Sequence, residues 1–101
     1  MNKKTIMVAL GGNALSPKSD AGTIENQFNH TKQSLNSLMH FVRNEYNICI
    51  THGNGPQVGA ELIRNELSAN KVPPLPLNVL VANTQGAMGY MIQQSLQNSL
   101  Y

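Results

Sequence analysis

The sequence has few of the features that mark secreted, nucleic-acid-binding or membrane proteins. Its single cysteine, Cys49, excludes an internal disulfide, so we expect a reducing compartment and a cytoplasmic location. Only 12% of the 101 residues are charged, and the formal net charge is +2 without a basic block, so neither nucleic acid nor a membrane surface is an expected partner. No apolar stretch approaches the ~20 residues of a membrane span, and no cleavable leader pattern is visible. We therefore expect a single soluble domain.

Several common site motifs are also missing. Neither G-x-x-x-x-G-K-[ST] nor G-x-G-x-x-G with an acidic partner occurs, which removes the two most frequent nucleotide-binding motifs. The sequence has no Cys and His cluster with zinc spacing and no nucleophile elbow. We therefore predict no metal ligands and assign no catalytic residue within this sequence.

Two apolar runs predict buried β-strands. Residues 5–10 read T-I-M-V-A-L and residues 46–50 read Y-N-I-C-I, and such runs are typical of parallel strands covered on both faces. Because Cys49 lies in the second run, we expect its thiol to be buried as a small hydrophobic group.

Helical periodicity occupies most of the remaining sequence. Between the two strands, apolar residues recur at helical spacing from Thr23, a candidate N-cap, to about residue 43. Pro56 opens a second helix, residues 68–76 form a proline-rich connector, and a third helix begins near Val79. This order predicts a βαβ unit at the start of an α/β fold, in which helices sandwich an open, mostly parallel sheet.

Each predicted strand is followed directly by a loop of glycine and asparagine. Because parallel strands have their carboxyl ends at one edge of a sheet, both loops are expected in the crevice where open α/β sheets bind ligands. Glycines let backbone N–H groups converge on an anion, and the helix that starts at Pro56 adds free N–H groups of its own. We therefore predict an anion clamp formed by Gly11, Gly12, Asn13, Gly53, Asn54 and Gly55.

Each of these features also has a simpler interpretation. A lone Gly-Gly pair after a strand is more often a tight turn than a ligand site, and His52 is more often a hydrogen-bonded structural histidine than a catalyst. The occurrence of two such loops at one sheet edge favours the anion site, in which His52 would have a supporting role.

Four segments carry a more specific signal. They read V-A-L-G-G-N-A-L (8–15), G-T-I-E-N-Q (22–27), I-T-H-G-N-G-P-Q-V-G (50–59) and Q-G-A-M-G-Y-M-I-Q-Q-S-L (85–96). In this order, and over nearly the whole chain, they resemble the N-terminal portion of carbamate kinase, within the amino-acid kinase family. Ala9 sharpens the resemblance, because acetylglutamate and uridylate kinases of this family usually carry a lysine two residues before the first glycine of the loop.

The resemblance implies an activity, ligands and an assembly. Carbamate kinases transfer a phosphoryl group reversibly between ATP and carbamate, and they make ATP from carbamoyl phosphate and ADP in the catabolic direction of arginine metabolism. A Mg²⁺ ion held mainly by nucleotide phosphates and a homodimer are also implied. On this sequence, the two glycine loops would surround carbamoyl phosphate, and the pocket would be closed, just before the third helix, by Gln85 and Gly86.

The sequence departs from the family pattern in two motifs and in length. Asn78 stands where P-L-D-V has aspartate, and Asn83 stands where A-M-[ST]-Q-G has methionine, so a carbamate-kinase-like paralogue acting on another small acid stays open. The resemblance leads us to expect that residues 1–101 correspond to the substrate-binding portion of a truncated domain without its nucleotide-binding half. The isolated chain is therefore expected to be inactive. A non-catalytic anion-binding or regulatory fragment is the other open interpretation.

Overall fold

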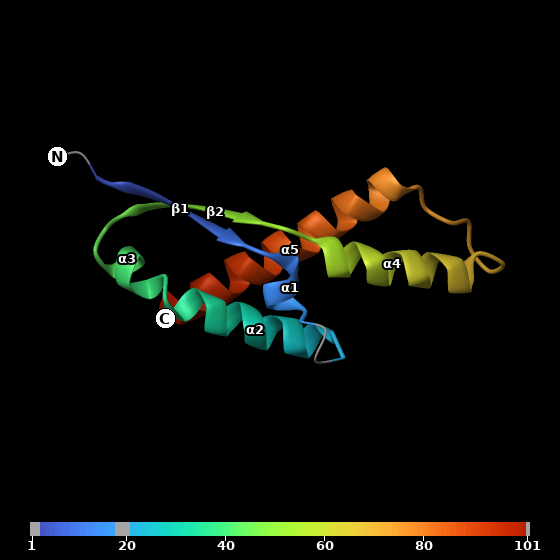
Figure 1. Cartoon of the computed structure of the whole chain (residues 1–101), viewed down its shortest axis with the longest axis horizontal. Coiled ribbons are helices and arrows are strands. Elements are labelled where there is room, and N and C mark those ends of the chain that lie inside the picture. The colour runs from blue at the N-terminus through green and yellow to red at the C-terminus, as the bar shows by residue number, and fades with distance from the viewer. Residues whose placement is uncertain (1–2, 18–20, 101) are drawn as a thin grey trace.

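The computed structural model describes residues 3–17 and 21–100, which form a two-stranded sheet and a set of helices (Figure 1). In chain order the elements are β1 (Thr5–Leu10), α1 (Gly12–Leu15), α2 (Ile24–Asn36), α3 (Met39–Arg43), β2 (Asn47–His52), α4 (Gly55–Ser68) and α5 (Leu77–Leu100). Among the described residues, no helix combines the length and the apolar character needed to cross a membrane.

The two strands pair in parallel, as the sequence predicts. The register places Thr5 opposite Asn47 and Leu10 opposite His52, and α1, α2 and α3 lie in the crossover between the strands. Strand β2 ends two residues later than the predicted run 46–50, because the pairing continues up to His52. Both strands therefore end at the same edge of the sheet, and the two glycine loops start there.

The part of the crossover from residue 23 to about residue 43 contains two helices, α2 and α3, instead of the single helix predicted there. α2 begins as expected, with the Thr23 hydroxyl accepting a hydrogen bond from the Asn26 N–H at 3.1 Å. It ends where the Leu38 N–H donates to the Leu35 carbonyl at 2.9 Å, a bond that spans three residues and tightens the turn. Both leucines stay buried across the break, so hydrophobic periodicity does not detect it.

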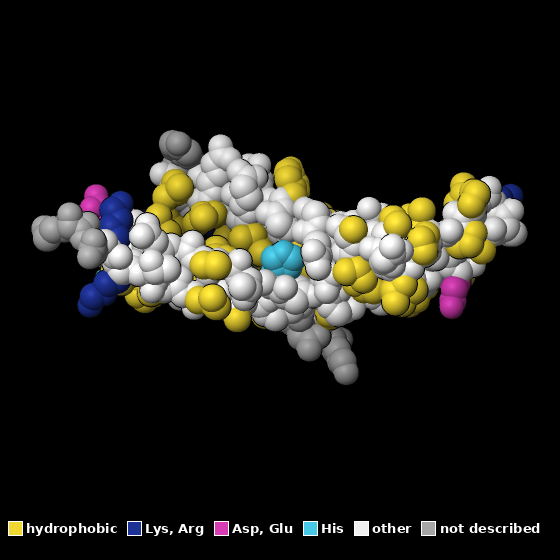
Figure 2. Space-filling view, turned by 90° about the horizontal axis from the view of Figure 1, so that it is seen from above, with side chains coloured by type: hydrophobic (Ala, Val, Ile, Leu, Met, Phe, Trp, Pro, Cys, Tyr) yellow, Lys and Arg dark blue, Asp and Glu magenta, His cyan; other side chains and the backbone are white. Residues whose placement is uncertain are grey.

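Helices cover only one face of the sheet. Burial alternates along both strands, and Val8 and Ile50 pack against the core, whereas Met7 is 74% exposed and Cys49 is exposed on the other face. The predictions of strands covered on both faces and of a buried Cys49 are therefore wrong for the described residues. A continuous apolar run does not specify what covers each face. Here the helices lie on one side of the strands (Figure 1), and hydrophobic side chains remain visible on the face in Figure 2.

The hydrophobic core lies where α5 packs beneath the sheet and against α2. Fully burying a leucine or methionine side chain contributes roughly 1.5–3 kcal/mol. Buried side chains form two clusters that both include α5: Leu10, Leu35, Leu38 and Ile92 in one, and Leu15, Met88 and Met91 in the other. This packing fixes the end of β1 and the short helix α1 over the middle of α5, so the first glycine loop rests on a rigid base.

Helix α4 contributes little to this core. It extends away from the sheet towards one end of the molecule (Figure 1), and its side chains Leu62, Ile63 and Leu67 are exposed. The connector that follows is fastened to α4 by Asn65, whose side chain accepts a hydrogen bond from the Leu75 N–H at 2.8 Å and donates one to the Leu75 carbonyl at 2.9 Å. Only the first turns of α4 therefore take part in the site at the sheet edge.

Candidate functional site

The two glycine loops lie in direct contact at the carboxyl ends of β1 and β2. The Gly53 N–H donates to the Leu10 carbonyl at 2.9 Å, which extends the strand pairing into the second loop. A Cβ atom on Gly53 would lie 3.1 Å from the Gly12 nitrogen. A Cβ atom on Gly12 would lie 3.1 Å from the Gly55 nitrogen and 3.0 Å from Pro56 Cδ. Glycine is needed at both positions because the backbones approach more closely than a side chain normally allows.

The other two predicted glycines face open space. A Cβ atom on Gly11 or on Gly55 would meet nothing within 4 Å, and both residues are exposed. The backbone at Gly11 has φ −72° and ψ 148°, which is an extended conformation open to any residue. The glycines thus divide into a packing pair, Gly12 and Gly53, and an open pair, Gly11 and Gly55. The open pair is the one that leaves space beside its backbone on the side where a Cβ atom would lie.

Helix α4 starts at Gly55, the last residue of the second loop, without a side-chain cap. Pro56 occupies the first turn, as the sequence predicts, and its missing N–H removes no hydrogen bond there. Asn54 precedes the helix, but its side chain makes no capping hydrogen bond. The N–H groups of the first turn and the helix dipole therefore favour a negatively charged ligand at this end of α4.

The side chain of Asn54 is bound to α5 instead. Its Nδ2 donates to Thr84 Oγ1 at 2.9 Å, and Thr84 Oγ1 donates to the Val81 carbonyl at 2.9 Å. Thr84 is only 5% exposed. Sequence reasoning missed this residue, because nothing in the pattern around it indicates contact with a loop thirty residues earlier in the chain.

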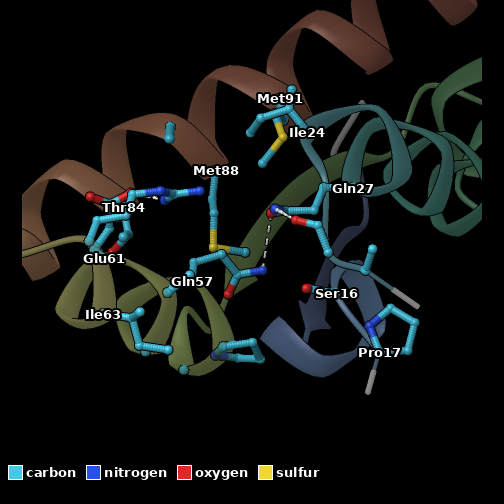
Figure 3. Close-up of a pocket in the computed structure, with 18 residues that line it drawn as sticks. Ser16, Pro17, Ile24, Gln27, Gln57, Glu61, Ile63, Thr84, Met88 and Met91 are labelled. Atoms are coloured by element: carbon cyan, nitrogen blue, oxygen red, sulfur yellow. Dashed lines mark hydrogen bonds and ion pairs between the residues drawn. The ribbon is translucent and has the colours of Figure 1, made fainter. Parts of the chain in front are cut away.

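Two buried glutamines connect the loops to α2 (Figure 3). Gln57 Nε2 donates to the Gly12 carbonyl and to Gln27 Oε1, both at 3.4 Å, and Gln27 Nε2 donates to the Gly22 carbonyl at 2.9 Å. Both glutamines are 8% exposed, and Gln57 Oε1 is buried without a hydrogen-bond partner among the described residues. Sequence reasoning missed this pair too, although both residues lie in the quoted motifs. The pair braces the first loop against α4.

A groove of about 610 Å³ lies beside the loops, between α4, α5 and the start of α2 (Figure 3). Its wall is largely apolar, with Ile24, Ile63 and Met88 among the lining residues, and Gln57 lines it as a polar side chain. Of the predicted site residues, only Gly55 borders this groove. The groove therefore adjoins one side of the second loop, whereas Gly11, Gly12, Gly53 and Asn54 do not line it.

The placement of Gln85 and Gly86 before the third helix is wrong. Both lie inside α5, on its exposed surface, because the helix starts at Leu77 and its first hydrogen bonds run from the Val79 and Leu80 N–H groups to the Pro76 carbonyl. They do not line the groove. Thr84 is the residue of this segment that reaches the loops, and any contact of Gln85 or Gly86 with a ligand stays a prediction.

Among the described residues, the immediate surroundings of the loops are polar and carry no cluster of charged side chains. His52 ends β2 as a half-buried residue whose Nδ1 is buried without a partner among the described residues. On the face in Figure 2, Lys and Arg side chains lie at the two ends of the molecule, away from its middle. The backbone of Asn13 lies in α1, and its side chain is outside what the structure describes. Within the described part of the chain, backbone N–H groups and side-chain amides are thus the available anion donors.

Fold and loop geometry define the class as an α/β protein with paired glycine loops at the carboxyl edge of a parallel sheet. No family model matches the chain. It is 48% identical to carbamate kinase from Escherichia coli (strain K12) over 92% of this chain and 31% of that protein. It is 40% identical to the carbamate kinase-like protein YahI of the same strain over 97% of this chain and 32% of that protein.

A solved structure gives the same result. Carbamate kinase from Giardia lamblia bound to AMP-PNP matches with a TM-score of 0.89 and 35% identity over 96% of this chain and 34% of that chain. The chain is therefore homologous to carbamate kinases, and the resemblance and the α/β fold class with a parallel sheet are confirmed, although helices cover only one face of the sheet in the described residues. The chain spans about a third of the length of the curated relatives it matches.

Proposed function

We propose that this chain forms the carbamoyl phosphate-binding part of a carbamate kinase, which transfers a phosphoryl group reversibly between ATP and carbamate. One observation carries the proposal: the two glycine loops touch each other beside the uncapped start of α4. Homology to carbamate kinases over 92% of the chain supports it.

In this proposal the loops bind and orient the phosphoryl group. Backbone N–H groups next to Gly11 and Gly55 approach its oxygens, and the Asn54 amide adds a donor without a net charge. We also retain the prediction that Asn13, Gln85 and Gly86 contact the substrate. A helix N-terminus stabilises an anion by only ~0.3–2 kcal/mol, so these groups position the substrate and bind it weakly, with a Kd of about 1 mM or more.

Nucleotide and metal are assigned to groups other than these loops. In the described part of the chain, no three His, Cys, Asp or Glu side chains gather into a set that could hold a metal ion. The AMP-PNP complex of the Giardia lamblia enzyme supports use of ATP and ADP. We propose that Mg²⁺ is held mainly by the nucleotide phosphates, as the resemblance implies.

We also propose that the parent enzyme is a cytoplasmic homodimer. The free, exposed thiol of Cys49 is compatible with a reducing compartment. The exposed apolar side chains of α4, Leu62, Ile63 and Leu67, supply a surface that a second subunit can cover.

A carbamate-kinase-like paralogue is the second candidate, favoured by the 40% identity to YahI. Asn78, one of the two departures from the family pattern, is exposed at the start of α5, where its Oδ1 accepts a hydrogen bond from the Val79 N–H at 3.0 Å. In this structure the Asn78 side chain therefore binds a backbone N–H in the first turn of α5. In the paralogue, the same loops would hold the phosphoryl group of a different small acid.

Titration of the chain with carbamoyl phosphate, followed by amide NMR spectra, tests both candidates. The first predicts shifts of the Gly11, Gly55 and Gln57 backbone amides, larger than those caused by acetyl phosphate at the same concentration and ionic strength. A stronger response to acetyl phosphate favours the paralogue. Absence of any response in the two loops at saturating concentrations of both compounds contradicts the anion-binding function itself.

A further inference from the structure

Asn54 has an unusual partner for a residue that precedes a helix. An asparagine at this position normally caps the helix, because its side-chain oxygen accepts a hydrogen bond from a backbone N–H of the first turn. Here no such bond forms, and the side chain instead donates to Thr84 in the middle of α5. The N–H groups in the first turn of α4 therefore receive no hydrogen bond from Asn54. The side-chain amide of Asn54 is held instead by α5, which is distant in sequence.

The hydrogen-bonding capacity of Thr84 dictates the orientation of the Asn54 amide. A threonine hydroxyl has a single proton, and Thr84 gives it to the Val81 carbonyl at 2.9 Å. The oxygen can then only accept, so it binds the amide nitrogen of Asn54 and would repel the amide oxygen. Thr84 is 5% exposed, so bulk water does not compete for this bond.

The remaining capacity of the amide suits an anion. The nitrogen of Asn54 carries two protons, and in the described part of the chain Thr84 accepts the only hydrogen bond it donates. A second N–H is thus left on a nitrogen that cannot exchange places with the oxygen. Among the three residues of the second loop, Gly53, Asn54 and Gly55, only Asn54 has a side chain that needs such orientation.

We propose that Thr84 is a positioning residue of the anion site: its hydroxyl, anchored on Val81, holds the Asn54 amide with its nitrogen fixed for an incoming phosphoryl group. The proposal rests on the anion-binding function proposed above. It adds to that function a residue on α5 that touches no substrate and acts through Asn54. Thr84 also lines the groove that Gly55 borders.

Two variants of Thr84 and one matched control test this role. Thr84→Val keeps the shape of the side chain and removes the hydroxyl, whereas Thr84→Ser keeps the hydroxyl. Thr31→Val is the control, because Thr31 is also buried and its hydroxyl donates to the backbone carbonyl of Gln27 at 2.7 Å, but it does not touch the loop. Loss of either hydroxyl leaves one carbonyl without its side-chain donor, so a purely structural effect appears in both valine variants.

The first readout needs no ligand. In spectra of the unliganded chain, the side-chain NH₂ of Asn54 is expected to show two well-separated resonances with slow solvent exchange. Thr84→Val should move both resonances to the two positions of a free asparagine amide and accelerate exchange, Thr84→Ser should restore them, and Thr31→Val should leave them unchanged. Unchanged Asn54 resonances in a folded Thr84→Val chain overturn the proposal.

The second readout is affinity for inorganic phosphate. Loss of one positioned hydrogen bond should weaken phosphate binding about three- to tenfold in Thr84→Val, with recovery in Thr84→Ser and no change in Thr31→Val. In an Asn54→Ala background, Thr84→Val should have no further effect, because both changes remove the same oriented amide. Additive losses in this cycle overturn the positioning role, and if Thr84→Val does not fold, failure of folded Thr84→Ser to match the unaltered chain does so as well. Absence of phosphate binding in the unaltered chain instead overturns the proposed function.

Discussion

Gly12 and Gly53 belong to different loops, yet a Cβ atom on Gly53 would lie 3.1 Å from the backbone nitrogen of Gly12. The two loops therefore form one packed unit, and the distance between their open glycines, Gly11 and Gly55, is set by this contact. Parallel pairing of β1 with β2 brings the loops to one edge, and the contact between the packing pair then aligns them. Changes at the packing pair and at the open pair should have different consequences.

Gly53→Ala should destabilise the chain. The added methyl group meets backbone atoms of the first loop, which cannot move aside without disturbing strand pairing, and overpacking of this kind costs about 1–3 kcal/mol. For a chain of this size the melting temperature should fall by roughly 4–8 °C per kcal/mol, which circular dichroism measures. Gly11→Ala is the matched control, since its Cβ meets open space and its φ of −72° suits alanine. Equal melting temperatures for the two variants would show that the loops are not in contact.

Gly55→Val should impair anion binding and leave the stability of the chain nearly unchanged. Its side chain enters open space, so the melting temperature should stay close to that of the unaltered chain, but the branched side chain blocks approach of an anion to the first turn of α4. Phosphate binding by the chain should be lost, and turnover in a full-length carbamate kinase with the equivalent change should fall about 10²-fold or more, as when one preorganised oxyanion donor is removed. Calorimetric titration and steady-state kinetics measure these effects. Normal phosphate affinity in a folded Gly55→Val chain would remove this glycine from the site.

His52→Asn should change little. Phosphoryl transfer depends chiefly on positioning and positive charge, and the half-buried imidazole at the end of β2 has no charged partner among the described residues. We expect phosphate affinity within about threefold of the unaltered chain, because the substitution should change the binding free energy by less than the contribution of one typical hydrogen bond. Loss of binding in a variant that keeps its melting temperature would give His52 a direct role.

The sequence predicted the parts of the fold that local pattern controls. The two apolar runs were sufficient to predict the parallel strands, and Thr23 and Pro56 correctly indicated where α2 and α4 begin. The break before Leu38 was missed, because a three-residue turn keeps the leucines on either side of it in the core. Exposure of Cys49 was missed because a strand pattern records hydrophobicity and not which elements cover each face.

The candidate site was predictable only in outline. Parallel strands bring their carboxyl ends together, so the meeting of both glycine loops followed from topology. The division into a packing pair and an open pair did not, since all four residues are glycine and differ only in their three-dimensional neighbours. Thr84 and Gln57 act through contacts thirty or more residues apart in the chain, at distances that no local spacing rule describes.

Cys49 provides a direct test of the uncovered sheet face. An exposed thiol on β2 should react with a soluble disulfide reagent in the native chain nearly as fast as in the unfolded chain, whereas a buried thiol reacts only after unfolding. Absorbance of the released thiolate follows the reaction, and Cys49→Ala gives the background. Protection in the native chain would mean that this face is covered in solution, and concentration dependence of the protection would identify a second copy of the chain as the cover.

The chain alone should not catalyse phosphoryl transfer. Stabilising a transferring phosphoryl group normally requires a metal ion together with fixed Lys or Arg side chains. Among the described residues, Lys32, Arg43 and Lys71 are exposed on helices or the connector, and Arg64 is paired with Glu61 on α4. Lys3 and Lys4 precede β1, at the end of the sheet opposite the loops. Lys18, which the sequence places in the polar loop after the first glycines and which is the one cation predicted to approach the site, lies outside the described residues.

Loop dipoles cannot replace these charges. A helix N-terminus supplies ~0.3–2 kcal/mol, whereas enzymes typically lower reaction barriers by ~8–23 kcal/mol. Incubation of the purified chain with carbamoyl phosphate, ADP and Mg²⁺, with ATP followed by luciferase, should give the same signal as a control without protein. ATP formation above that control, abolished by Gly55→Val, would show that the two loops catalyse the reaction by themselves. Binding of carbamoyl phosphate without ATP formation is the outcome that the geometry of the loops requires, because they supply oriented N–H groups and no fixed positive charge.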